Sequence, residues 1–266
     1  MASIVALVRC SHPEPVLAVT AVTGILAFSA GRGAGTAWVV LAVLAGQLFT
    51  GWTNDYLDRD RDRRARRTDK PLAQDRIQPR TVAAAALVAL GAAVPLSLAS
   101  GVPATAVHLT AMAAATTYNF GVKATPLSVL PYAIAFALLP AFVTLGLPAG
   151  HWPPGWALAA GALIGAGAHF AQVLPDIEQD RRQHLLGLPQ RLGGRPSALA
   201  AALLLATAAA LIAIGTNNIL PALITTPVAA AVAFVRPKTA FRLTLATAAI
   251  TVVAFLASGS SLAERQ

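Results

Sequence analysis

Apolar residues in this chain gather in long runs, which short polar segments separate. A helix that crosses a bilayer needs about 20 mostly apolar residues. The pattern predicts nine membrane-spanning helices, at residues 16–30, 36–56, 81–98, 102–120, 127–147, 156–174, 197–214, 219–235 and 240–257. We therefore predict an all-α, polytopic membrane protein. Because no long polar stretch interrupts the runs, residues 1–266 are predicted to form a single integral membrane domain.

Composition supports a lipid environment for most of the chain. Hydrophobic residues make up 56% of the sequence and charged residues only 12%, whereas soluble domains carry about 25% charged residues. The single cysteine, Cys10, excludes an intramolecular disulfide framework.

The basic residues lie almost entirely on one side of the predicted topology. If nine helices alternate in direction, 18 of the 20 Lys and Arg residues fall in the N-terminal segment and in the loops after the second, fourth, sixth and eighth helices. Positive residues stay on the cytoplasmic side, so we predict a multi-pass protein of the cell membrane with a cytoplasmic N-terminus and the C-terminus on the opposite side. The net charge of +9 is explained by this asymmetry, and nucleic acid is not expected as a partner.

Three aspartates end the second apolar run. Asp55, Asp58 and Asp62 are spaced three and four apart, so on a helix they share one face. Carboxylates held this close repel one another unless a cation lies between them. Oxygen-only ligands suit a hard ion such as Mg²⁺, which often shares its coordination shell with substrate phosphates.

A smaller acidic cluster ends the sixth run. Asp176 and Asp180 are four apart and share a face, whereas Glu178 lies off that face and is interpreted as a solvated charge. The two motifs, at residues 54–62 and 176–180, are both predicted to face the cytoplasm. Because each is followed by arginines, among them Arg181, we predict that one diphosphate is held by metal ions from two sides.

Basic and aromatic residues near these motifs are candidates for the same diphosphate. Arg67 and Lys70 follow the first motif, and Tyr118 and Lys123 end the fourth helix. Guanidinium groups bind phosphate oxygens bidentately, although loop cations also serve as topology signals or as anchors to anionic lipid headgroups.

Polar residues continue from both motifs into the apolar runs. His169 and Gln172 precede the second motif at spacings that predict one polar stripe along the sixth helix, and Gln47 precedes the first motif on the second helix. Polar side chains in a lipid-embedded helix usually face a cavity or a partner. We therefore expect these three to line a pocket, while His108 is interpreted as structural or pocket-lining.

The two motifs in this frame resemble the signatures of the UbiA-type intramembrane prenyltransferases. The first is Asn54-Asp55-x-x-Asp58-x-x-x-Asp62 and the second is Asp176-x-x-x-Asp180. The resemblance implies a helical bundle around a central cavity, in which Mg²⁺ and a polyprenyl diphosphate bind before an allylic carbocation forms. It also implies metal ligation and catalysis by the motif aspartates, with Asn54 as a further metal ligand, and diphosphate binding by Arg67, Lys70, Tyr118 and Lys123. Tyr118 and Lys123 stand one residue farther apart than the tyrosine–lysine pair common in the family.

Three hypotheses for function remain open from the sequence. The first is transfer of a prenyl group from a prenyl diphosphate donor to an aromatic or quinone-precursor acceptor, or to another small lipid. The second is a membrane terpene cyclase that ionises an allylic diphosphate without an acceptor. The third is an ion-coupled transporter, which is weakened because the acidic residues lie at one face instead of the midplane. The lipid bilayer is an expected partner, and no obligatory protein partner is predicted.

Overall fold

The computed structural model describes residues 2–263, and every regular element in that range is helical. The longer α-helices are α2 (Pro13–Ser29), α3 (Gly35–Arg64), α4 (Pro79–Leu98), α5 (Val102–Asn119), α6 (Leu130–Leu145), α7 (Gly155–Val173), α10 (Gly194–Thr216), α11 (Leu220–Ala231) and α12 (Pro237–Ala257). Shorter elements are α1 (Ala2–Cys10), α8 (Ile177–Arg182), α9 (Leu188–Leu192), α13 (Gly259–Ala263) and the 3-10 turns η1 (Val122–Ala124) and η2 (Val232–Phe234).

Each predicted run corresponds to one of the longer helices, so the all-α prediction is confirmed for the described residues. Five helices in this part of the chain are long and apolar enough to cross a membrane, namely α3, α4, α7, α10 and residues Thr239–Ala257 of α12. The protein is therefore a multi-pass membrane protein. The remaining four longer helices fall short of that criterion, so nine complete spans stay a prediction.

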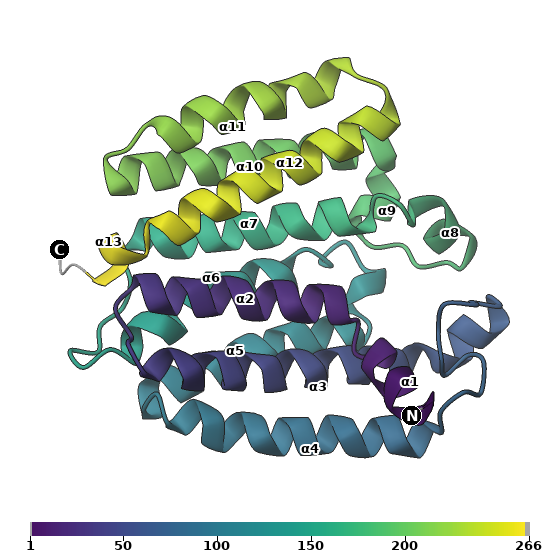
Figure 1. Cartoon of the computed structure of the whole chain (residues 1–266). Coiled ribbons are helices and arrows are strands. Elements are labelled where there is room, and N and C mark those ends of the chain that lie inside the picture. The colour runs from purple at the N-terminus through teal and green to yellow at the C-terminus, as the bar shows by residue number, and fades with distance from the viewer. Residues whose placement is uncertain (1, 264–266) are drawn as a thin grey trace.

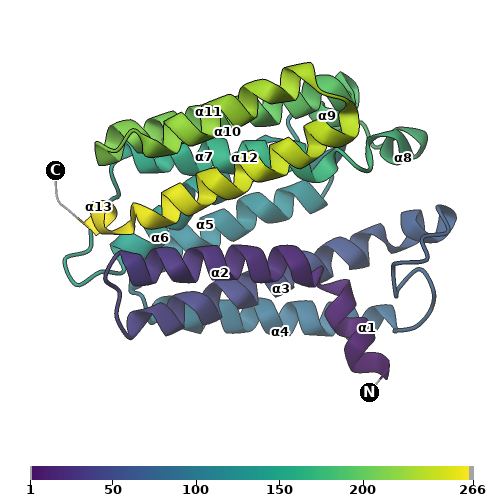
Figure 2. The same ribbon diagram turned by 45° about the horizontal axis from the view of Figure 1, so that its top comes forward.

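The long helices lie side by side, with their axes running broadly in the same direction (Figure 1). Helix α3 packs against α2 and α4, α6 packs against α5 and α7, and α10 packs against α7, α11 and α12. Turning the molecule shows the same order of layers, from α4 through α3, α2 and α7 to α11 (Figure 2). The structure is thus a helical bundle whose two halves meet where α2 and α6 face α7 and α12.

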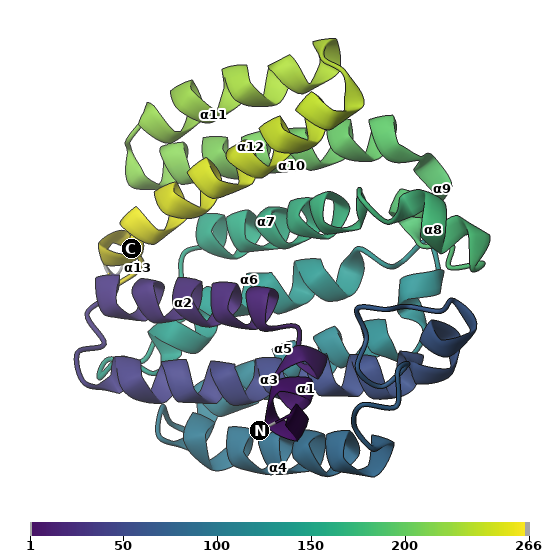
Figure 3. The same cartoon turned by 45° about the vertical axis from the view of Figure 1, so that its right-hand side comes forward.

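Both acidic segments lie at the same end of this bundle. The C-terminal end of α3, the loop after it, α8 and α9 gather at one end, together with α1, while α13 lies at the other (Figures 1 and 3). This placement agrees with the topology expected from the loop charges. Residues 264–266, predicted to be on the opposite side, lie outside the described part of the chain.

Helix α3 continues eight residues beyond the predicted end of its apolar run, to Arg64. Its last turns carry alternating acidic and basic side chains, and Arg61 donates a hydrogen bond to Asp58 three residues earlier (2.8 Å). Pairs at this spacing support a helix outside the apolar layer. The whole first motif is therefore helical, and Asp55, Asp58 and Asp62 share a buried face.

The second motif is not on the same helix as His169 and Gln172, so the predicted continuous stripe is wrong. Helix α7 ends at Val173, and Asp176 is the N-cap residue of the separate helix α8. Pro175 lies between them; proline lacks an N–H and disfavours helix in the residue before it. Asp176 and Asp180 keep their i, i+4 relation within α8, where the Asp180 N–H donates to the Asp176 carbonyl (2.8 Å).

The corner between α1 and α2 is pressed against α3. His12 there adopts the left-handed conformation (φ 58°), and Trp52 of α3 donates an indole hydrogen bond to the Leu7 carbonyl (2.9 Å). Gly51 allows the close approach, because a Cβ at this position would lie 2.1 Å from the Ser11 carbonyl oxygen. The corner thereby carries His12 to the acidic face of α3.

We expect Gly51→Ala to destabilise the protein by about 1–3 kcal/mol, because the new methyl group meets backbone that cannot move aside. The melting temperature in detergent would report this loss. Gly91→Ala is the matched control: it is an exposed helical glycine with no atom within 4 Å of an added Cβ, and alanine there favours the helix. Equal melting temperatures for the two variants would contradict the packing argument.

Candidate functional site

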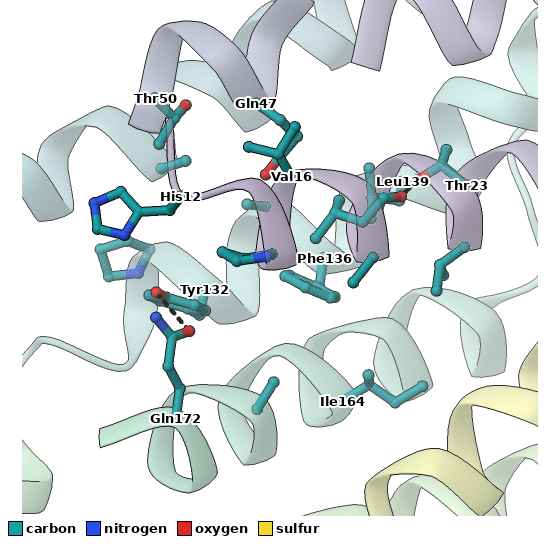
Figure 4. A pocket seen from close by; sticks show the side chains of 18 of the residues that line it. His12, Val16, Thr23, Gln47, Thr50, Tyr132, Phe136, Leu139, Ile164 and Gln172 are labelled. Carbon is teal, nitrogen blue, oxygen red and sulfur yellow. Dashed lines mark hydrogen bonds between the residues drawn. The ribbon is translucent and has the colours of Figure 1, made fainter. Parts of the chain in front are cut away.

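A cavity of about 390 Å³ lies inside the bundle. Its walls come mainly from α2, α3, α5, α6 and α7. Helix α10 contributes one side chain, Leu205, and α12 contributes three. Ser11, His12, Asn54, Tyr118 and Gln172 line it toward the acidic end. The deeper walls are mostly apolar, and Val16, Phe136, Leu139 and Ile164 surround the space between α2, α6 and α7 (Figure 4). Most of this volume suits a hydrophobic ligand whose polar end faces the acidic motifs.

Asp55 is almost fully buried, with 1% of its surface exposed, and two basic groups face it. Lys70 Nζ donates to Asp55 Oδ1 (2.6 Å), and His12 Nε2 lies 2.8 Å from the same oxygen. Lys70 reaches this position because the loop after α3 is anchored by Leu72, which packs in an apolar cluster with Ala6 of α1 and Val82 of α4. Burial of a charge requires such pairing.

Asp58 is neutralised by a different pair of cations. Lys123 Nζ donates to both carboxylate oxygens (2.5 and 2.6 Å), and Arg61 donates to Oδ2 (2.8 Å). The chain reverses at Gly121 (φ 123°), a conformation that L-residues rarely adopt, and so turns η1 toward α3. This turn brings Lys123 to Asp58, although Lys123 is one residue farther from Tyr118 in the sequence than the family pattern has it. Burial lowers the pKa of the Lys123 amine, and the Asp58 charge opposes that shift.

Asp62 completes the buried face of α3. It is 4% exposed, and its closest basic atom is Nη2 of Arg61, at 3.8 Å. Asn54, one turn earlier than Asp58, donates from Nδ2 to Asn119 Oδ1 (3.0 Å), and Asn119 in turn donates to the Thr50 carbonyl (3.0 Å). The amide oxygen of Asn54 is thereby left available to a ligand.

The second motif is more open than the first. Asp176 is exposed, while Asp180 is half-buried and accepts a hydrogen bond from Gln190 Nε2 (2.8 Å). Burial raises the pKa of Asp180 and the neighbouring Asp176 charge raises it further, whereas the Gln190 hydrogen bond and the charge of Arg61 lower it. Arg181 is exposed on α8, and among the described residues no ion pair joins it to an acidic side chain.

Arg67 connects the two motifs electrostatically. Its guanidinium binds Asp69 bidentately (2.8 and 2.7 Å), which raises the pKa of Arg67 and lowers that of Asp69 to about 2. The charges of Asp176 and Asp62 raise the Arg67 pKa further. Arg67 therefore lies within the field of both acidic motifs, although its closest partner is Asp69.

The carboxylates suit a hard divalent cation by their chemistry, but they do not converge on one point. In the described part of the chain, no group of three or more His, Cys, Asp or Glu side chains is close enough to hold a metal ion. Asp55 Oδ2 is nevertheless buried without a hydrogen-bond partner in the structure, which is the environment of an oxygen that can still accept a ligand. An all-oxygen donor set with waters and phosphate completing the shell matches Mg²⁺.

Of the three predicted pocket residues, Gln47 and Gln172 line the cavity. Gln172 Oε1 accepts a hydrogen bond from the Tyr132 hydroxyl (3.2 Å; Figure 4). His169 is not among the lining residues. Its ring packs beside Tyr118 and Tyr132, and its Nε2 lies 3.1 Å from Ser128 Oγ, so its polar contact is made within the protein.

Sequence reasoning assigned no role to three residues that contact the motifs: His12, Asn119 and Gln190. His12 lies 43 positions before Asp55, Asn119 lies 65 positions after Asn54, and Gln190 lies 10 positions after Asp180, so spacing alone does not predict these contacts. No local signal predicted the corner at His12, because a residue before proline is normally extended, whereas His12 is left-handed (φ 58°).

Comparisons with known proteins agree with this arrangement. The profile of the UbiA prenyltransferase family matches residues 16–259, and the chain belongs to that family, which confirms the resemblance seen in its motifs. No curated protein gives a significant match.

Solved structures share the fold over nearly their whole length. A UbiA homolog from Archaeoglobus fulgidus bound to GPP and Mg²⁺ is 19% identical, with a TM-score of 0.68, covering 95% of this chain and 99% of that one. An apo UbiA homolog from Aeropyrum pernix K1 is 22% identical, with a TM-score of 0.69 over 91% and 96% of the two chains. A digeranylgeranylglyceryl phosphate synthase is 17% identical, with a TM-score of 0.73 over 98% and 100%. At these identities the likeness establishes the fold alone.

We expect Lys123→Met to lower the stability of the ligand-free protein by about 3 kcal/mol, because it leaves the buried Asp58 with Arg61 as its remaining cation. Melting temperature in detergent, without added divalent ions, measures the effect. The double variant Lys123→Met/Asp58→Asn is expected to recover most of the loss, since the uncompensated charge is gone. Additive losses in the double variant would show that the ion pair does not stabilise the site.

Proposed function

We propose that this protein is a Mg²⁺-dependent prenyltransferase, which ionises an allylic diphosphate and transfers the prenyl group to an aromatic or quinone-precursor acceptor. One observation carries the proposal: paired carboxylates and cations gather beyond one end of a cavity whose deeper walls are mostly apolar. Family membership supports it, as does the fold shared with a homolog solved with GPP and Mg²⁺.

In this proposal the carboxylates of both motifs bind the metal. Asn54, Asp55, Asp58 and Asp62 act from α3, and Asp176 and Asp180 act from α8. A bound divalent ion would stabilise the negative charge that develops on the departing diphosphate. The unpartnered Oδ2 of Asp55 and the exposed carboxylate of Asp176 are the oxygens that need the least rearrangement to become ligands.

The cations that neutralise the carboxylates in this structure are proposed to bind the diphosphate. With the carboxylates of Asp55 and Asp58 neutralised by a divalent ion, the ammonium groups of Lys70 and Lys123 would be free to bind phosphate oxygens. Arg67 and Arg181 contribute from the rim, and Tyr118 donates a hydroxyl hydrogen bond from the cavity wall. Exchange of one charged partner for another keeps every buried charge compensated.

The cavity would protect the carbocation from water. Its deeper walls are built mostly from aliphatic side chains together with Phe136 and Phe255, and exclusion of water prevents premature quenching of a reactive cation. The same walls would also suit a cyclase, which ionises an allylic diphosphate but has no acceptor. Only a requirement for an acceptor separates these two reactions.

We further infer that residues 1–266 act as a single domain with nine membrane spans, and that both motifs face the cytoplasm. The location of both motifs at one end of the bundle supports this orientation (Figure 1). Labelling of single cysteines introduced into the loop after α3 and into the loop before α7, from either side of sealed vesicles, would test it. Labelling of both loops from the same side would contradict it.

The decisive experiment is an assay of diphosphate release by the purified protein with Mg²⁺ and a series of allylic diphosphates, with and without phenolic acceptors. Release that requires an acceptor and yields a prenylated ring is the expected result. Release without an acceptor, giving a cyclic hydrocarbon or alcohol, would identify a cyclase instead. No release with any donor would overturn both reactions.

We expect Asp176→Asn to reduce activity at least 100-fold while membrane insertion and melting temperature stay unchanged, since removing one electrostatic contributor to a transition state commonly costs that much. Glu178→Gln is the matched control, because it removes one negative charge from the same short helix at an exposed position. A fully active Asp176→Asn enzyme would overturn the metal site shared by two motifs.

A further inference from the structure

A small side chamber opens beside the main cavity, between α3, α5 and α6. Its volume is about 30 Å³, enough for one water molecule or one hydroxyl group. Seven of its lining residues, including Gln47, Thr50 and Phe136, also line the main cavity, so the two spaces are contiguous. Gln47 and Thr50 project from α3 into the region where they meet (Figure 4).

His108 of α5 lines the chamber and is 4% exposed. Its ring stacks on Phe142, with centroids 4.6 Å apart, and its Nδ1 lies 2.7 Å from Ser97 Oγ of α4. A histidine held this deeply in a lipid-embedded bundle is costly unless its polar atoms have partners.

The hydrogen bonds around Ser97 determine which imidazole nitrogen carries the proton. Ser97 Oγ lies 2.6 Å from the Ala93 carbonyl, which can only accept, so the single hydroxyl proton is used there. Ser97 can therefore only accept from His108, and Nδ1 must be the protonated nitrogen. Nε2 is left as a hydrogen-bond acceptor, with no partner in the described structure.

The polar groups at this junction are all uncharged. Thr50 donates its own hydroxyl proton to the Gly46 carbonyl (2.9 Å), so its oxygen, like His108 Nε2, is an acceptor. Gln47 supplies a neutral amide. Among the described residues that line the main cavity there is no Asp, Glu, Lys or Arg. A ligand group that lies deep in the cavity should therefore be neutral, and one that reaches the chamber should donate a hydrogen bond.

We propose that the side chamber is a hydroxyl-binding subsite for an uncharged phenolic acceptor, with His108 Nε2 accepting a hydrogen bond from the acceptor hydroxyl. This inference rests on the proposed transferase function and narrows its substrate class to acceptors without a carboxylate. Gln47 lies two helical turns before Asn54 on α3, about 10 Å deeper. An acceptor seated in the chamber thus extends along α3 toward the acidic end, where the donor is proposed to ionise.

The test compares three acceptors with one prenyl diphosphate: hydroquinone, its dimethyl ether 1,4-dimethoxybenzene, which has no hydroxyl to donate, and 4-hydroxybenzoate. We expect the wild-type protein to have a KM about fivefold lower for hydroquinone than for the ether, the value of one neutral hydrogen bond. The carboxylate is expected to raise KM by more than tenfold, because neither the chamber nor the deeper walls of the cavity contain a Lys or Arg to compensate its charge.

Two variants separate a binding role from a structural one. His108→Leu is expected to abolish the preference for the free hydroxyl, while His108→Gln, which keeps an acceptor oxygen, should retain part of it. Ser97→Ala does not touch the cavity, but it frees Nδ1 and lets the proton move to Nε2. We expect Ser97→Ala to bring the ratio of the KM values for the ether and for hydroquinone close to one, while the KM for the prenyl diphosphate stays unchanged.

Calorimetric binding of the same three compounds to the protein without donor keeps this inference separate from the proposed function. Tighter binding of hydroquinone than of the ether, lost in His108→Leu, supports the subsite even if no transfer occurs. An unchanged hydroxyl preference in both His108→Leu and Ser97→Ala overturns it and assigns the chamber to a structural water. Tightest binding of 4-hydroxybenzoate overturns the neutral acceptor class while leaving the transferase proposal intact.

Discussion

The site is built around the burial of aspartate side chains at the end of a membrane-spanning helix. Asp55, Asp58 and Asp62 are each less than 10% exposed, and isolated carboxylates are not stable in such surroundings. The chain supplies a compensating cation from a separate segment for two of them: Lys70 from the loop after α3 and Lys123 from η1. These ion pairs hold the loop, α1 and the end of α5 against α3, so the requirement for neutrality also organises the local fold.

The same pairing explains how a cluster of charged side chains can exist within a lipid-embedded bundle. The charged groups are confined to the end of the cavity, and the deeper walls are uncharged among the described residues. In the proposed function, attraction for a diphosphate and exclusion of water would therefore be provided by different parts of one space. Hydrogen-bonding groups inside the apolar part, such as Gln47 and His108, are neutral and can select a ligand without attracting ions.

Much of the architecture could be predicted from the sequence, because lipid imposes a simple rule of length and polarity. Each apolar run became a helix, and the spacing of Asp55, Asp58 and Asp62 correctly predicted one shared face. The rest depended on contacts that no local pattern encodes. The pairing of His12 with Asp55 requires the corner at Ser11 to meet Gly51. The polar stripe does not continue into the second motif, because Pro175 separates Asp176 from α7. The loop cations were identified as a group, but only the fold shows which carboxylate each one contacts.

The break at Pro175 gives the two halves of the site different stiffness. The first motif is part of a 30-residue helix that packs against α2 and α4, so its backbone moves only if that helix moves. The second motif lies on a six-residue helix, and a single side-chain hydrogen bond, from Gln190, ties its Asp180 to the segment that follows. A ligand that draws the two motifs together therefore displaces α8 far more easily than α3. Adjustment to ligands of different size is thus concentrated in one short segment, and the lipid-facing bundle does not have to deform.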